Sequence, residues 1–441
     1  MKDQPKITVG ILDRRKEICG YLHGDFFLAG FGSVSGRFSI RAEEKRVSFT
    51  DERGHEILRS SRIELSPVED SAFTLFNVTI GDRFHWKREE DQVFRGSLIF
   101  QGREDETLAA INEIGVEDYL TGVISSEMSE EAPFEFLKAH AILSRSWVLA
   151  SLGKTAKGSP KPSVHEEVTQ EEVIRWYDRE EHDLYQVCAD DHCQRYHGAG
   201  KSVSGRAREA VQATFGRVIT YQGEICDARY SKACGGRTEL FRTAWEDREV
   251  PYLQSVSDGP IHDGPILTEE DASCFVYSSP QAHCNTHDEG LLKRILSKPD
   301  RETGDFFRWR VEYGREEMEE ILWKKSGFDF GTLKDIVPLR RGPSGRISHL
   351  KIVGSKKSVV VGKELEIRRW LSRSHLYSSA FVVETKRDIR GIPERFLFRG
   401  AGWGHGVGLC QIGAAVMATH GFSSEGILSH YFRGTTIERI Y

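Results

Sequence analysis

The segment formed by residues 116–153 places a carboxylate among apolar side chains. Glu127 follows Val123 by four residues and Ile124 by three, so in a helix its side chain lies along the same face as theirs. An ionised carboxylate there loses hydration, so it must either pair with a cation or donor or hold a proton near neutral pH. A carboxyl group that holds a proton can act as a general acid. The alternative is a carboxylate at a helix end that reaches solvent or caps its neighbours. The apolar residues at helical spacing are Val116, Leu120, Val123, Ile124 and Met128.

A second helix is predicted to follow, because Pro133 suits a first helical turn and Gly153 ends the pattern. Its apolar residues occupy most of its sides, which is typical of a buried helix. Arg145 interrupts this surface, and a buried arginine needs an acidic partner. Glu127 and Glu117 are the nearest candidates in the sequence, and a solvated Arg145 is the alternative.

A cluster of cysteine and histidine lies within residues 182–197. Two cysteines and up to three histidines supply thiolate sulfur and imidazole nitrogen, the usual donors of tetrahedral zinc, and a set of two histidines and two cysteines would leave no open position, as in a structural site. The spacing is not that of a standard zinc finger. A disulfide between Cys188 and Cys193 with bystander histidines explains these residues equally well.

Glycine occupies four alternate positions between residues 402 and 408. Glycine forfeits side-chain packing and backbone order in a strand, so another group is expected to approach this backbone closely. Trp403 and His405 stand between the glycines and suit stacking on a sugar ring and donating a hydrogen bond; a tight loop filled by the tryptophan is the alternative.

A double glycine, Gly235 and Gly236, follows a cysteine and allows a turn with positive φ or a close approach to a ligand. Cysteines 226 and 234, and likewise 274 and 284, are candidate cross-links, with free thiols as the alternative.

Composition narrows the classes of protein. The 441 residues suffice for one large or two to three ordinary domains, and 39% hydrophobic with 29% charged residues is normal for a soluble protein. A net charge of −6, with basic residues scattered among acidic ones, argues against a nucleic-acid partner. No apolar run is long enough for a transmembrane segment, and the N-terminus lacks the apolar core of a signal peptide.

The sequence pattern predicts both strands and helices around these residues, and therefore an α+β protein. Residues 1–100 form a β-rich N-terminal module of short strands separated by turns, and residues 101–441 form a mixed α/β region around the central helix pair. Residues 166–178 are predicted to be an acidic helix, and residues 335–365 a strand–turn–strand insertion. Two further helices are expected over residues 411–420 and 424–432.

Several of these stretches together resemble the SpoIID/LytB family of bacterial cell-wall proteins. VEDYLTGVISSEM followed by LKAHAILSRS is similar to the family's most distinctive motif. ARYSKACGGRTE, PYLQSV, and GWGHGVGLCQIGAAVMA with ILSHYFRGTTI match further on, in the same order. The resemblance covers residues 95–441, so it implies a SpoIID-like catalytic domain with a substrate cleft over residues 101–441.

The resemblance implies lytic transglycosylation of peptidoglycan, which cleaves the MurNAc–GlcNAc bond and forms a 1,6-anhydro ring without water. It assigns the role of acid/base to Glu127. It also implies a structural zinc ion in segment 180–200, held by His182, Cys188, His192 and Cys193. The residues that the matched motifs make candidates for binding the glycan strand are Glu117, Tyr119, Arg145, Ser231, Gly235, Gly236, Trp403, His405 and Gln411.

The chain departs from the family pattern at two positions, with His140 in place of the usual Gln and Cys410 in place of a common Ser. An extracytoplasmic location is expected from the function, whereas the sequence shows no signal peptide. A second reading is a non-catalytic peptidoglycan-binding protein that stimulates a cell-wall amidase, an activity also ascribed to the family. A third is a cytosolic structural protein stabilised by zinc.

Overall fold

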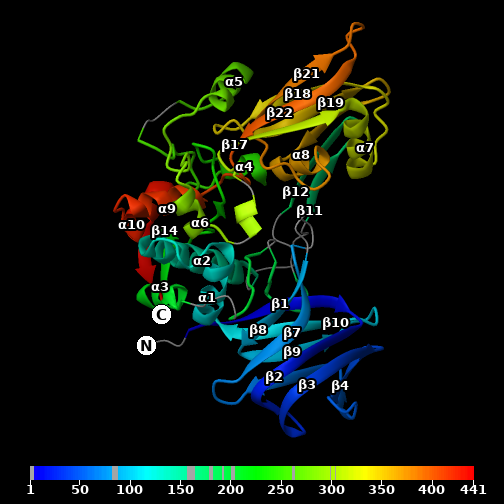
Figure 1. The fold of residues 1–441 in the computed structure, drawn as a ribbon, viewed down its shortest axis with the longest axis vertical. Coiled ribbons are helices and arrows are strands. Elements are labelled where there is room, and N and C mark those ends of the chain that lie inside the picture. Colours follow the sequence, from blue (N-terminus) through cyan, green and yellow to red (C-terminus); the bar gives the residue numbers. More distant parts are fainter. Residues whose placement is uncertain are drawn as a thin grey trace.

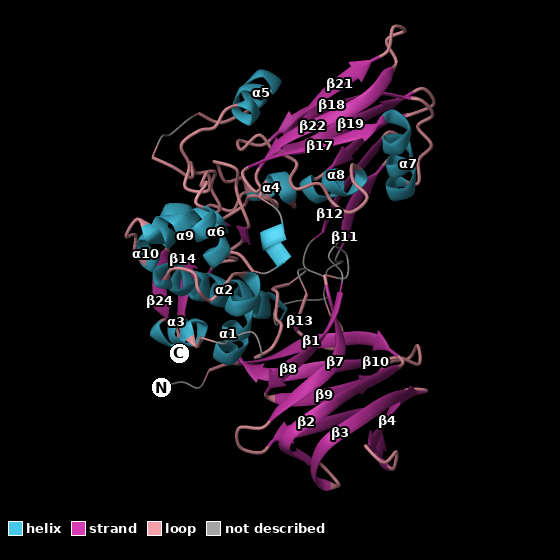
Figure 2. Cartoon of the chain, in the orientation of Figure 1, coloured by secondary structure: helices cyan, strands magenta, loops and turns pink. Residues whose placement is uncertain are grey.

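The structure is a computed structural model that describes residues 4–81, 88–155, 164–177, 182–190, 193–199, 204–260, 264–297, 299–302 and 304–441. The chain forms three parts, which are a β-sheet region containing the N-terminus, a helical middle and a second β-sheet region (Figure 1). Helices gather in the middle, and strands occupy the two ends (Figure 2).

The N-terminal part is one large sheet in which most neighbouring strands run antiparallel. Side chains of a strand alternate between its two faces, and strand β2 shows this alternation, with Ile18, Leu22 and Phe26 buried while Tyr21 and Phe27 are exposed. The strands are β1 (Lys6–Arg15), β2 (Glu17–Leu28), β3 (Gly32–Glu43), β4 (Arg46–Asp51), β5 (Glu56–Ser60), β6 (Arg62–Pro67), β7 (Ala72–Ile80), β8 (Arg88–Arg95), β9 (Ser97–Gly102) and β10 (Leu108–Gly115).

The helical middle begins where β10 ends, because Gly115 passes directly into helix α1. Helix α2 is buried on most of its sides, as its all-round apolar sequence predicts. A small sheet of β14, β15 and β24 completes this part. The elements are α1 (Val116–Glu127), α2 (Phe134–Thr155), α3 (Arg206–Ala213), α6 (Glu289–Ile295), α9 (Gln411–Thr419), α10 (Ser424–Tyr431), β14 (Arg217–Tyr221), β15 (Glu224–Ile225) and β24 (Thr436–Arg439).

The third part holds two sheets and a core of its own. One sheet has the order β17-β22-β21 and the other β11-β12-β20-β19-β18. Its elements are β11 (Val164–Val168), β12 (Glu172–Tyr177), α4 (Phe241–Ala244), α5 (Glu269–Tyr277), β17 (Arg308–Gly314), α7 (Arg315–Ser326), β18 (Leu333–Arg341), β19 (Ile347–Gly354), β20 (Ser358–Gly362), α8 (Glu364–Trp370), β21 (Phe381–Arg387) and β22 (Pro393–Ala401).

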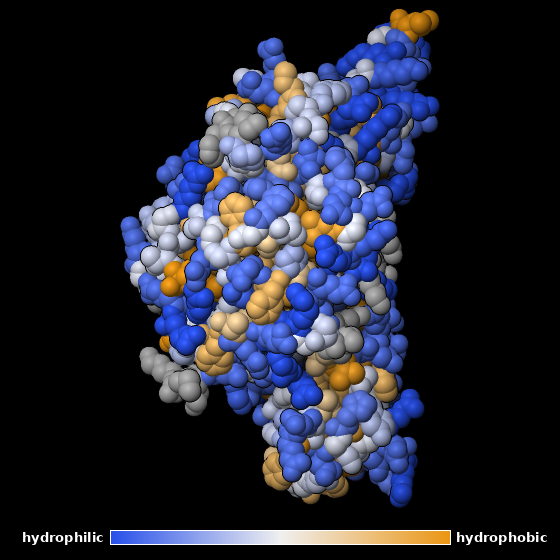
Figure 3. All heavy atoms as spheres, turned by 60° about the vertical axis from the view of Figure 1, so that its left-hand side comes forward, coloured by the Kyte–Doolittle hydropathy of each residue, from blue (hydrophilic) through white to orange (hydrophobic). Residues whose placement is uncertain are grey.

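Two short pairings connect these parts through their loops. Strand β16 (Tyr230–Ser231) runs parallel to β23 (Leu409–Cys410), which brings the double-glycine loop beside the glycine-rich loop. Strand β13 (Val187–Cys188) adds to the N-terminal sheet next to β1. A single apolar core runs from the N-terminal sheet into the helices. The face in Figure 3 is largely hydrophilic, with hydrophobic side chains in small separate patches.

The predicted α+β class and β-rich N-terminal region are confirmed. The N-terminal sheet continues past residue 100, because β10 pairs with both β1 and β9; the division into two domains stays a prediction. No helix among the described residues is long and apolar enough to cross a membrane.

The predicted acidic helix over residues 166–178 is wrong, since residues 166–168 lie in strand β11 and residues 172–177 form strand β12. Val173 and Ile174 are β-branched and pack inward, and β12 adds in parallel to β20. Residues 333–362 form the antiparallel strands β18, β19 and β20 where a strand–turn–strand insertion was predicted.

Candidate active site

Glu127 is the last residue of α1 and is buried, with 8% of its surface exposed. Its Oε1 accepts hydrogen bonds from the Tyr230 hydroxyl at 2.9 Å and from the backbone N–H of Arg195 at 3.1 Å. The sequence required either a donor or a proton for this carboxylate, and the structure supplies two donors. Both bonds fall on one oxygen, so among the described residues Oε2 is the oxygen left for another group.

The rings of Tyr230 and His140 pack against each other beside Glu127, with their centroids 5.2 Å apart. Burial, reinforced by the nearby carboxylate of Glu127, raises the pKa of Tyr230 well above its usual value, so its hydroxyl stays a donor near neutral pH. Burial lowers the pKa of His140 to about 4, so its ring is neutral there. Gln411 Nε2 lies 3.0 Å from His140 Nε2, so the start of α9 lies beside these two rings.

Lys232 places a cation directly behind Glu127. Its Nζ donates to the backbone carbonyl of Glu127 at 3.0 Å, and so caps the end of α1, and to Asp300 Oδ2 at 2.7 Å. Asp300 also pairs with Arg195 at 3.3 Å. Burial works to raise the pKa of Asp300, but the charges of Lys232 and Arg195 outweigh it and hold that pKa well below its usual range.

These partners of Glu127 were not predicted. Tyr230 and Lys232 lie inside the motif ARYSKACGGRTE, so this motif could have identified them as candidate site residues. Asp300 and the backbone of Arg195 reach the site only through the fold, and no local pattern marks them.

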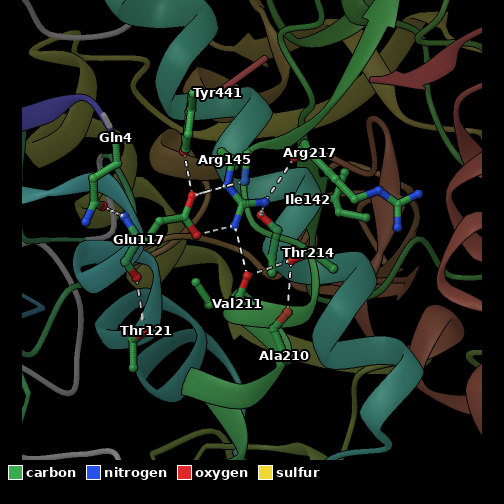
Figure 4. A network of polar contacts seen from close by, with 12 residues as sticks. Gln4, Glu117, Thr121, Ile142, Arg145, Ala210, Val211, Thr214, Arg217 and Tyr441 are labelled. Atoms are coloured by element: carbon green, nitrogen blue, oxygen red, sulfur yellow. Dashed lines mark hydrogen bonds and ion pairs between the residues drawn. The ribbon is translucent and has the colours of Figure 1, made fainter. Parts of the chain in front are cut away.

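The acidic partner of Arg145 is Glu117, in a two-bond pair of 2.8 and 2.6 Å that joins α2 to α1 (Figure 4). The Tyr441 hydroxyl donates to the same carboxylate, and Arg145 Nη1 donates to the carbonyl of Arg217. Glu117 and Glu127 lie ten residues apart on one helix, roughly 15 Å along its axis. The partners of this pair are internal, so it braces the helices, and contact with a substrate stays a prediction.

Tyr119 and Ser231 are also buried. The Tyr119 hydroxyl donates to Gln194 at 3.2 Å, and its ring packs on Tyr196. Ser231 Oγ has no hydrogen-bond partner among the described residues, although it lies beside the glycine-rich loop. The glycan contacts predicted for both stay predictions.

The glycine-rich loop is approached by the protein itself. All four glycines have positive φ, and a Cβ on Gly406 would lie 2.3 Å from the guanidinium carbon of Arg346. A Cβ on Gly402 would lie 2.7 Å from the carbonyl of Cys234, and Arg346 Nη1 donates to the same carbonyl at 3.1 Å. The close approach predicted from the glycine pattern is confirmed, and the approaching groups are the double-glycine loop and the turn between β18 and β19.

Gly235 and Gly236 in the neighbouring loop also have positive φ. A Cβ on Gly235 would lie 2.6 Å from the backbone nitrogen of Gly402, so this turn fits tightly against the glycine-rich loop. A Cβ on Gly236 would meet the ring of Phe275 at 3.2 Å. Contact of either glycine with a ligand stays a prediction.

Trp403 and His405 are both partly buried. Trp403 stacks on Tyr377 with ring centroids 4.4 Å apart and packs against Phe306, so one of its faces is already covered. His405 packs against Trp245, and burial together with nearby arginines lowers the pKa of His405 well below its usual value. A neutral His405 accepts the Val407 N–H at Nδ1, which leaves Nε2 as its donor.

The structure brings three of the predicted zinc ligands together. Donor atoms of His182, Cys188 and Cys193 all lie within 4.8 Å of one another, and Cys193 Sγ is 3.5 Å from His182 Nε2. Cys193 Sγ also accepts the Cys188 N–H, as a thiolate ligand does. His192 lies outside the described residues. These donors fit a zinc ion, and no disulfide joins the two cysteines.

The other predicted cysteine pairs do not form. All eight cysteines are free thiols, and Cys274 is exposed while Cys226 is buried. Cys234 faces Cys284 at 3.7 Å between sulfur atoms, because the fold brings their loops together.

Comparison of the sequence with known protein families gives two matches. The sequence model of the stage II sporulation protein family matches residues 104–221, which include α1, α2 and the 182–193 segment. A second family model, described as a domain of unknown function, matches residues 239–408.

The chain is 24% identical to stage II sporulation protein D of Bacillus amyloliquefaciens, over 74% of this chain and 75% of that protein. It is 26% identical to an uncharacterized protein of Brachyspira hyodysenteriae, over 78% of this chain and 72% of that protein. It is also 22% identical to the amidase enhancer of Bacillus subtilis, over 72% of this chain but 40% of the enhancer. With its motifs in register from residue 116 to residue 437, the chain is similar to the proteins of the SpoIID/LytB family, and its residues 104–221 match the stage II sporulation protein model.

Proposed function

We propose that this protein is a peptidoglycan lytic transglycosylase in which Glu127 is the single acid/base. The observation that carries the proposal is the setting of this carboxylate, which is buried at the end of α1 with two donors on Oε1 and with Oε2 left for another group. A lytic transglycosylase needs one carboxyl group that first gives and then takes a proton. A substrate cleft beside Glu127 is part of the proposal.

The proposed reaction has two proton transfers at the same side chain. Protonated Glu127 gives its proton to the glycosidic oxygen while the bond from C1 of MurNAc to that oxygen breaks, leaving an oxocarbenium-like centre. The 6-hydroxyl of the same sugar attacks C1, and its proton passes to the Glu127 carboxylate. The products are a GlcNAc end and a 1,6-anhydro end, so no water is consumed and the enzyme returns to its starting protonation state.

The neighbours of Glu127 have supporting roles in this scheme. The Tyr230 hydroxyl and the Arg195 N–H stabilise the carboxylate once it has given up its proton. Lys232 holds the end of α1, and Asp300 balances its charge. Neutral His140 adds no competing charge to the site.

The glycan strand is proposed to lie along the glycine-rich and double-glycine loops. Trp403 offers a partly exposed ring for sugar stacking, and His405 lies two residues further along the same loop. A structural zinc ion, held by His182, Cys188, Cys193 and His192, would fix the segment that leads into Arg195 and so position the donor to Glu127. The site of action would be extracytoplasmic, where peptidoglycan lies.

The test is digestion of purified sacculi by the wild type and by Glu127→Gln, with release of anhydro-muropeptides measured by mass spectrometry. Glu131→Gln is the matched control, because Glu131 is an exposed glutamate four residues further along the chain, in the turn between α1 and α2. The glutamine cannot deliver a proton, so release should fall at least about a hundredfold in Glu127→Gln alone. Equal release by the wild type and Glu127→Gln would refute the assignment.

A second candidate function is stimulation of a cell-wall amidase, which the similarity to the amidase enhancer supports. This function needs a glycan-binding surface but no proton transfer at Glu127. It predicts no anhydro products from the wild type, and amidase stimulation that Glu127→Gln leaves unchanged.

A further inference from the structure

A second set of metal-ligating residues lies apart from the 182–193 segment. Cys234, Asp258, Cys284 and Cys410 are all buried, and one donor atom from each lies within 4.8 Å of the others. They come from three separate loops and from the end of strand β23, so the cluster is a product of the fold. We propose that these four residues bind a structural zinc ion.

The geometry fits tetrahedral zinc. A zinc–sulfur bond of about 2.3 Å gives a sulfur–sulfur edge of about 3.8 Å in a tetrahedron, and the sulfur atoms of Cys234 and Cys284 are 3.7 Å apart. Three thiolates and one carboxylate fill four positions, and leave none open for water. This is the arrangement of a structural rather than a catalytic site.

The surroundings of the cluster orient its donors as a metal site requires. The N–H of Cys234 donates to Cys410 Sγ at 3.2 Å, which favours a thiolate. Asp258 accepts the Tyr431 hydroxyl on Oδ1 and the Cys284 N–H on Oδ2 at 2.7 Å. A Cβ on residue 413 would lie 2.3 Å from Asp258 Oδ1, so Gly413 leaves room for the carboxylate.

Charge also favours a bound cation. Asp258 is buried, and within the described part of the chain both of its side-chain oxygens accept neutral donors and no ion pair. Buried carboxylates usually pair with a cation or coordinate a metal. Zinc with three thiolates and one carboxylate carries a formal charge of −2. The positive charge of Arg308 offsets part of it, because Arg308 Nη1 donates to the carbonyl of Gly235, next to Cys234. Arg308 donates to backbone carbonyls, and no carboxylate pairs with it among the described residues.

The metal would join the two loops that border Glu127. Cys234 lies two residues after Lys232, and Cys410 directly precedes Gln411, which contacts His140. Cys284 and Asp258 attach both loops to the segment before α6. The site would therefore hold the glycine-rich loop and the double-glycine loop in register. Zinc binding there does not depend on the proposed reaction, and the test measures metal without measuring activity.

The test counts zinc in the full-length chain, purified under reducing conditions after growth with added zinc. Elemental analysis and native mass spectrometry should find two zinc ions in the wild type and in Cys274→Ser, whose thiol is exposed and is not among the four donors of the cluster. Cys284→Ser and Cys193→Ser should each hold one.

X-ray absorption of the wild type keeps the test independent of how the variants fold. Two filled sites give more sulfur than nitrogen and oxygen ligands around zinc, whereas a site at residues 182–193 alone gives equal numbers. One zinc ion with equal ligand numbers would overturn the proposal. So would a Cys234–Cys284 disulfide found by mass mapping, or two zinc ions retained in a folded Cys284→Ser.

Discussion

At the scale of single residues, the proposed proton transfers fall on one oxygen of Glu127, Oε2. The carboxylate is fixed by a side-chain hydroxyl and a backbone N–H, while Lys232 and Asp300 form a paired charge behind it. This arrangement holds the carboxylate in one orientation, so that Oε2 faces a constant direction. Orientation of a proton donor is what general acid–base catalysis requires of a protein.

Tyr230→Phe should lower anhydro-muropeptide release by about tenfold to a hundredfold, because it removes one hydrogen bond to a charged carboxylate. The ring packing on His140 is kept, so the melting temperature should change little. Tyr21→Phe, at an exposed tyrosine of β2, is the control. Unchanged release in Tyr230→Phe would mean that Tyr230 plays no part in the reaction.

His140 should make the protein less stable in acid. Its pKa is about 4 in the folded state and about 6.5 in the unfolded chain, so the unfolded chain takes up the proton first as pH falls. The contribution of neutral His140 to the free energy of unfolding is therefore fully present above pH 6.5. It is lost between about pH 6.5 and pH 4, and the loss amounts to up to about 3 kcal/mol. His140→Gln should flatten this part of the profile in urea unfolding, whereas His55→Gln, at an exposed histidine, should not. Parallel profiles for all three proteins would contradict the effect.

At the scale of elements, the two glutamates of α1 lie at its opposite ends and in different surroundings. The one near its start, Glu117, is hydrogen-bonded to Arg145 of α2 and to Tyr441 (Figure 4). The one at its end, Glu127, lies at the candidate site. Arg145 also reaches the carbonyls of α3 and β14. One arginine therefore fixes the direction in which α1 points Glu127.

Arg145→Met should destabilise the protein by about 3–5 kcal/mol, because it leaves the Glu117 carboxylate buried without its cation. The double variant Glu117→Gln, Arg145→Met should lose less, since no buried charge remains unpaired. Arg59→Met breaks two exposed ion pairs, which solvent screens, so it should cost much less than Arg145→Met. Urea unfolding measures all three, and similar losses for Arg145→Met and Arg59→Met would refute the bracing role.

The glycine-rich loop can be tested by comparing two glycines with positive φ. Gly421→Ala adds a Cβ in open space, so it should cost only the backbone strain of about 1–2 kcal/mol. Gly406→Ala places the same Cβ against the Arg346 guanidinium, so its loss in urea unfolding should be larger. Equal losses would mean that Arg346 moves aside freely.

At the scale of the whole molecule, one apolar core joins the N-terminal sheet to the helices, and a second core fills the upper sheets (Figure 1). The candidate site lies in the helical middle, and residues separated by more than 100 positions meet there, as Tyr230 and Glu127 do. The turn between β18 and β19 crosses from the upper sheets to the glycine-rich loop through Arg346.

Local sequence predicted the elements whose patterns are strong. The helix that ends at Glu127 follows from apolar spacing, and the glycine-rich loop follows from four glycines that a strand would not tolerate. Partners were harder to predict, because they depend on long-range packing. Arg145 had two candidate partners, and only the placement of α2 against the start of α1 selects Glu117. The charge pattern of residues 166–178 predicts a helix, and it carries no sign of the partner strand β20, which pairs with β12 from almost 190 positions further along the sequence.

The most direct test of the central claim is the fate of water during digestion of sacculi. In water enriched in ¹⁸O, wild-type protein should release 1,6-anhydro muropeptides that carry no ¹⁸O, because the 6-hydroxyl of the sugar replaces water. Glu127→Gln should release at most about a hundredth of this product, while Glu131→Gln should match the wild type. Products that carry ¹⁸O at C1 would show hydrolysis instead of transglycosylation. Intact glycan from the folded, zinc-loaded wild type would contradict the proposed enzyme altogether.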